Sequence, residues 1–123
     1  MMGEEKRSSQ VDIVELSFDF AVNVVRAVGS FPKTTTGFEL GKQLIRSGTS
    51  IGANVEEAQG ARTKREFINS MNIAKREARE TRFWLRLLRT SGTLEHKVAD
   101  ALIDQAERLI RILTAIVKTS EGH

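Results

Sequence analysis

The sequence predicts an all-α protein, an elongated, antiparallel up-down-up-down four-helix bundle that assembles as a homo-oligomer. The 123 residues include one proline, and helix-forming residues fill the stretches between widely spaced turn clusters. Within those stretches, apolar residues recur every three or four positions. Because the connections are short, consecutive helices are expected to run antiparallel. With 40% hydrophobic residues, a chain of this length can bury one core.

The first helix is expected over residues 11–28 and ends in the turn segment 29–37. Its apolar residues share one face: Ile13, Leu16, Phe20, Val24 and Val28. We expect a single domain over residues 11–119, with flexible termini at 1–10 and 120–123.

The second helix is expected to begin at a capping box formed by Thr36 and Glu39 and to continue to Gln59. Gly60 is expected to close it in the left-handed conformation. Its apolar face consists of Leu40, Leu44, Ile51, Val55 and Ala58. Three glycines lie inside it: Gly41, Gly48 and Gly52. Each costs about 1 kcal/mol relative to alanine, which predicts a close approach of another backbone.

A polar row lies beside this apolar face at spacings of four and three: Gln43, Ser47, Ser50, Asn54 and Glu57. Such a row can bind a polar ligand, hydrogen-bond across a bundle, or face solvent. We expect Ser50, Asn54 and Glu57 to form a hydrogen-bonded row at a bundle or subunit boundary.

The third helix is expected to begin at a capping box of Thr63 and Glu66 and to reach Thr90, a length of ~40 Å. This exceeds the diameter of a compact sphere of the same mass, so the molecule should be elongated. Its core seam is Phe67, Met71, Ala74, Ala78, Thr81, Leu85 and Leu88. The fourth helix is expected over residues 94–118. Its apolar row is Ala99, Ile103, Ala106, Ile110, Leu113 and Val117.

Ile73, Trp84 and Leu87 lie to one side of the third helix's seam and make its apolar arc wider than one bundle core requires. This excess predicts a subunit interface, because large exposed apolar patches mark interaction sites. The alternative is that Trp84 covers its own bundle.

A row of cations lies on the other side of that seam: Lys75, Arg79, Arg82, Arg86 and Arg89. The segment 62–89 holds nine basic and three acidic residues, a net charge of +6 in a chain that totals +3. Such a ridge can follow the phosphate backbone of RNA or DNA. Two alternatives stay open, namely salt bridges to other helices or subunits and a solvated face.

The same sequence offers little for catalysis. There is no cysteine, which excludes disulfides, thiolate metal sites and cysteine nucleophiles. The two histidines lack a nucleophile and carboxylate at a recognisable spacing, and no phosphate-binding glycine motif occurs. We therefore expect no enzyme activity, no metal and no cofactor. Neither a secretory signal nor a membrane span is recognisable, so a cytoplasmic location is expected.

Several motifs resemble a known family. They are Phe31-Pro32, the segment 43–57, Lys64-Arg-Glu-Phe67 and the segment 73–85. The sequence resembles the four-helix-bundle proteins encoded by intervening sequences within bacterial 23S ribosomal RNA genes, also called ribosomal-protein-like. Ser50, Ile51, Asn54 and Glu57 match the family signature, whereas Ala58 replaces a glycine that is common there.

The resemblance implies a homo-oligomer, with pentamers known in the family, and no established enzyme activity. A related accessory protein of diversity-generating retroelements looks like the same bundle and assists a reverse transcriptase through a basic surface. By analogy, the expected partners are a second copy of this chain and RNA or DNA. A protein partner is the alternative.

Overall fold

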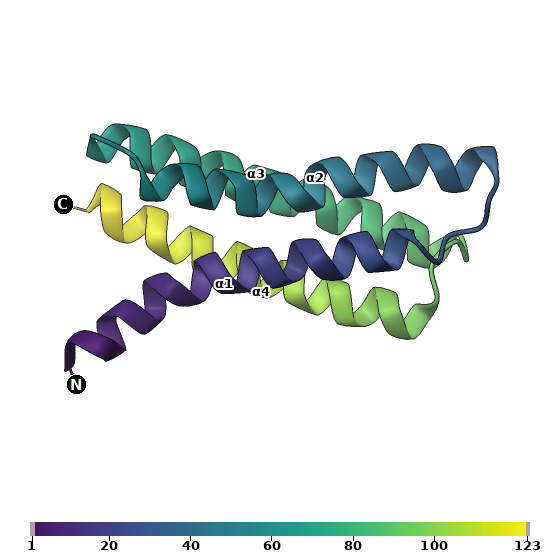
Figure 1. Ribbon diagram of the computed structural model, residues 1–123, viewed down its shortest axis with the longest axis horizontal. Helices are drawn as coiled ribbons and strands as arrows, with labels where there is room; N and C mark the ends of the chain where they lie inside the picture. Colours follow the sequence, from purple (N-terminus) through teal and green to yellow (C-terminus); the bar gives the residue numbers. More distant parts are fainter. Residues whose placement is uncertain (1, 123) are drawn as a thin grey trace.

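The computed structural model describes the backbone of residues 2–122 and the side chains of residues 13–122. Its four helices are α1 (Met2–Val28), α2 (Thr35–Gln59), α3 (Lys64–Thr90) and α4 (His96–Glu121). They form an elongated bundle in which consecutive helices run in opposite directions (Figure 1). Each helix packs against its neighbour in the chain, and α1 also packs against α4. The predicted all-α, four-helix architecture is confirmed.

The core runs along the bundle axis and receives side chains from all four helices. On α3 the predicted seam is buried from Met71 to Leu88, and Phe67 packs against it while partly exposed. On α4 the core also includes Leu102 and Leu109, which lie beside the predicted row. The buried face of α4 is wider than one stripe because this helix packs against both α1 and α3.

The glycines of α2 allow α1 to approach closely, as predicted. A Cβ atom added to Gly48 would lie 3.0 Å from both γ-methyl groups of Val24 on α1. At Gly52 the added atom would lie 3.3 Å from the carbonyl oxygen of Ser17. Side chains at these positions would separate the two helices.

The start of α2 differs from the prediction. The N-cap residue is Thr34, whose Oγ1 accepts a hydrogen bond of 3.0 Å from the backbone N–H of Gly37, and the predicted capping box of Thr36 and Glu39 does not form. A Cβ at Gly37 would collide with the Pro32 carbonyl oxygen. Only glycine fits this close approach to the preceding chain, and α2 therefore starts earlier than the capping pattern predicted.

Two connections also correct the sequence analysis. Gly60 has a φ of −95°, not the left-handed conformation, because the N–H groups of Gly60 and Ala61 close tight turns onto the carbonyls of Glu57 and Ala58. Among the described residues, the positive φ occurs at Gly92, at 78°. The cap at Thr63 is confirmed by its 3.1 Å bond from the N–H of Glu66.

The outer ends of α1 and α4 extend beyond the predicted limits. α1 begins at Met2 instead of residue 11, and its N-terminal part diverges from the other helices (Figure 1). α4 covers residues 96–121 instead of 94–118. Leu94 is buried at the end of the preceding turn, with its N–H bonded to the carbonyl of Leu88. Flexibility of the termini stays a prediction, and residues 1 and 123 lie outside the described residues.

Candidate functional site

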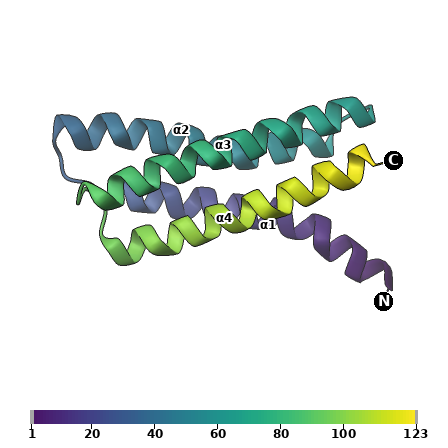
Figure 2. The same cartoon turned by 180° about the vertical axis from the view of Figure 1, so that it is seen from behind.

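The cationic row of α3 borders α4. Arg82 Nη1 lies 3.8 Å from Glu107 Oε2, and Arg89 Nε lies 2.6 Å from Asp100 Oδ1. These pairs place the row along the α3–α4 boundary, where the two helices lie side by side (Figure 2). Part of the row therefore does form salt bridges to a neighbouring helix, which was one of the alternatives. Each such partly exposed pair contributes at most about 1 kcal/mol.

The other three cations of the row are Lys75, Arg79 and Arg86. None of them has a carboxylate within 4 Å among the described side chains. Arg79 and Arg86 are exposed, and Lys75 is half-buried. Arg86 lies in a surface hollow of about 520 Å³ together with the two paired arginines, Ile103 and Glu107. These three positive charges are open to an anion from solvent.

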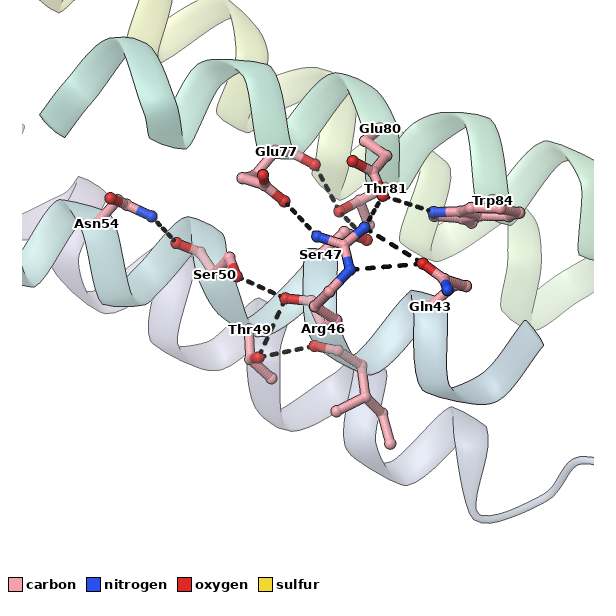
Figure 3. A network of polar contacts seen from close by, with 11 residues as sticks. Gln43, Arg46, Ser47, Thr49, Ser50, Asn54, Glu77, Glu80, Thr81 and Trp84 are labelled. Atoms are coloured by element: carbon pink, nitrogen blue, oxygen red, sulfur yellow. Dashed lines mark hydrogen bonds and ion pairs between the residues drawn. The ribbon is translucent and has the colours of Figure 1, made fainter. Parts of the chain in front are cut away.

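The polar row of α2 bonds mainly to its own helix (Figure 3). Ser50 Oγ donates to the carbonyl of Arg46 at 2.7 Å, and Asn54 Nδ2 donates to the carbonyl of Ser50 at 2.8 Å. Gln43 accepts hydrogen bonds of 3.4 Å from Arg46, while Glu57 is exposed. The bonds of Ser50 and Asn54 are local and do not join two helices.

Ser47, a member of the polar row, and Arg46 beside it reach α3. Ser47 Oγ and Thr81 Oγ1 share a buried hydrogen bond of 2.9 Å. Arg46 Nη1 lies 3.3 Å from Glu77 Oε2, and its Nη2 pairs with Glu80 (Figure 3). Arg46 was not predicted, because the sequence does not show which residue of α2 lies opposite the acidic side of α3.

The three predicted interface residues have different environments. Trp84 is half-buried against the bundle core, and its Nε1 donates to Glu80 at 2.9 Å. Ile73 and Leu87 remain 36% and 39% exposed. Phe83, which the prediction omitted, is 56% exposed and lies one helical turn from Leu87. The exposed apolar surface of α3 is thus carried by Ile73, Phe83 and Leu87.

Further exposed apolar residues lie on α1 and α2. They are Phe18, Val25, Phe38 and Ile45. None was expected, because their spacing of seven within each helix also fits an ordinary core row.

The chain matches the 23S rRNA-intervening sequence protein family over residues 9–115. It belongs to that family. The chain is similar to a protein with unknown function from the S23 ribosomal protein family of Bacteroides thetaiotaomicron, which has a crystal structure, and the two sequences are 34% identical. The match covers 89% of this chain and 98% of that one, with a TM-score of 0.84. No curated protein matches the chain.

The family match includes the cationic row, the polar row and the exposed apolar residues of α3. It confirms the resemblance found in the sequence. Among the described residues, no three histidine or acidic side chains gather as metal ligands would, and none of the described helices is long and apolar enough to cross a membrane.

Proposed function

We propose that this protein is a non-enzymatic helical bundle of the cytoplasm that binds RNA or DNA through the cationic row of α3. The observation that carries the proposal is the alignment of Lys75, Arg79 and Arg86 on one side of α3, without carboxylate partners among the described side chains. Cations aligned along a helix gain affinity for a polyanion by releasing its condensed counterions.

The expected binding is weakly sequence-specific. Phosphate contacts position a protein on nucleic acid but do not read bases. Base stacking requires exposed aromatic rings, and the row itself contains none. Of the two aromatic residues next to the row in sequence, Trp84 packs against the core and Phe83 is exposed, which leaves one ring available for stacking.

Fluorescence anisotropy with labelled single-stranded RNA and DNA tests the proposal. Affinity for both should fall steeply as salt rises from about 50 to 200 mM. Arg79→Gln/Arg86→Gln should lower the slope of log affinity against log salt by about 0.7 for each phosphate that is no longer neutralised. The matched control, Arg26→Gln/Lys33→Gln, removes the same charge from exposed positions on α1 and the following turn. Equal losses of affinity in both variants, or no binding at low salt, would refute the proposal.

A second candidate function is self-assembly through the exposed apolar surface of α3. Ile73, Phe83 and Leu87 support it, since a solvated helix face gains nothing from such side chains. The family resemblance favours a pentamer. Light scattering coupled to size exclusion should give several times 13.7 kDa, and Phe83→Ser/Leu87→Ser should lower that mass. A parent protein that is monomeric at tens of micromolar would contradict self-assembly. If the surface instead binds a different protein, the chain is monomeric alone and forms a complex only with that partner.

A further inference from the structure

Two ion pairs define how α3 and α4 are aligned. Arg82 pairs with Glu107, and Arg89 pairs with Asp100. A step of seven residues forward on α3 thus matches a step of seven residues backward on α4, as expected for antiparallel helices with equal rise. The same step in the other direction places Lys75 at the level of Thr114.

This alignment divides the boundary between the two helices into two halves of different charge. In the half next to the turn at residues 91–95, α4 carries Asp100, Asp104 and Glu107. Two of these acids pair with Arg82 and Arg89 of the cationic row. On the two facing flanks of this half, the formal charges of three acids and of Arg82, Arg86 and Arg89 therefore cancel, although Arg86 itself has no carboxylate within 4 Å among the described side chains.

The other half has no such compensation. α4 contains no acidic residue between Glu107 and Glu121, and the flank that carries Glu107 continues with Arg111, Thr114 and Lys118. The part of α3 that lies opposite, between Glu66 and Glu77, is also free of acids.

The nearest acids on α3 do not face this flank. Glu77 and Glu80 point to α2, where both pair with Arg46. Lys75, Arg79, Arg111 and Lys118 have no carboxylate within 4 Å among the described side chains. Arg79, Arg111 and Lys118 are exposed.

We infer that the phosphates of RNA or DNA bind a two-helix cluster formed by Lys75 and Arg79 of α3 with Arg111 and Lys118 of α4. This inference rests on the proposed function and narrows its site. The strand lies across the α3–α4 boundary in the half away from the turn at residues 91–95. Arg82 and Arg89, although they belong to the cationic row, are held by α4 and do not contact phosphate.

Two double variants that remove equal charge test this location by anisotropy with a labelled single-stranded RNA. Arg79→Gln/Arg111→Gln should weaken binding and lower the salt slope by about 1.4, because two phosphates are no longer neutralised. Arg82→Gln/Arg89→Gln should retain the parental slope. Circular dichroism and light scattering confirm that both variants keep the fold and the oligomeric mass.

A gain-of-binding variant is independent of any loss of folding. Thr114→Lys adds a cation to an exposed site inside the cluster and should tighten binding, raising the slope by about 0.7. Its matched control, Ala53→Lys, adds the same charge to an exposed site on α2 and should leave the slope unchanged.

The outcomes separate the two proposals. If Arg82→Gln/Arg89→Gln weakens binding as much as Arg79→Gln/Arg111→Gln, or if both added lysines tighten it equally, the cluster is refuted while nucleic-acid binding stands. If the parent binds no RNA or DNA at low salt, or binds only an acidic peptide, both proposals fail.

Discussion

The buried hydrogen bond between Ser47 on α2 and Thr81 on α3 predicts that replacing one residue destabilises the protein more than replacing the other. Both residues are 0% exposed. Thr81 Oγ1 also lies 2.7 Å from the carbonyl oxygen of Glu77, to which it donates. A hydroxyl carries one hydrogen, so Ser47 donates to Thr81 and depends on it as a partner.

Removing one partner should therefore cost more than removing the other. Ser47→Ala leaves Thr81 bonded to Glu77, and we expect a loss of about 1 kcal/mol, the usual net value of one hydrogen bond. Thr81→Val preserves the side-chain shape but leaves the buried Ser47 hydroxyl without its partner, at a cost of about 1–3 kcal/mol. The double variant leaves no hydroxyl unsatisfied, so it should be no less stable than Thr81→Val alone.

Guanidinium unfolding of the parent, both single variants and the double variant, followed by circular dichroism, measures these free energies. The double variant should fall short of the sum of the single effects by about 1 kcal/mol or more. Strict additivity would refute the reasoning, because it would mean that the Ser47 hydroxyl finds another partner when Thr81 is changed. The denaturant slope m should be equal in all four proteins, as a change in m would indicate a different unfolding transition.

Three further predictions test local features of α2 and its ends. Thr34→Ala should lower the free energy of unfolding by about 1 kcal/mol because it removes the N-cap, while Thr36→Ala should have little effect; equal effects in thermal unfolding would contradict the observed cap. Gly48→Ala should destabilise by about 1 kcal/mol or more, since crowding against Val24 outweighs the gain in helix propensity. Gly60→Ala should instead be neutral or stabilising by about 0.4–1 kcal/mol, because its φ is negative and its surroundings are open. If Gly48→Ala instead stabilises the protein, α1 must move away to make room for the added methyl group.

The burial of α3 could be predicted from the sequence because the seam from Met71 to Leu88 repeats with the period of the helix itself. Periodicity reports which side of a helix is buried, but it does not report how far two helices are shifted along each other. The pairing of Arg46 with Glu77 and Glu80 depends on that shift between α2 and α3.

The same limitation applies to the cationic row. Its five members are equivalent by spacing, yet Asp100 and Glu107 engage only two of them. The predicted N-cap of α2 was wrong for a different reason, because three consecutive threonines offer the same hydroxyl group as a cap. The choice among them was decided by the contact of Gly37 with the chain at Pro32, which no local capping pattern contains.

The pattern of contacts between the helices has a consequence for folding. α1 packs on α2, α2 on α3 and α3 on α4, whereas the packing of α1 on α4 closes a long loop. Its polar part is a 3.2 Å bond from Asn23 Nδ2 to Gln105 Oε1. Loop-closure entropy disfavours this packing until the other helices are in place. Because the N-terminal part of α1 also diverges from the bundle (Figure 1), we expect α1 to dock last and to open first. The α3–α4 boundary would outlast that opening, which amide hydrogen exchange would show as early exchange in α1 and late exchange along the centre of α3.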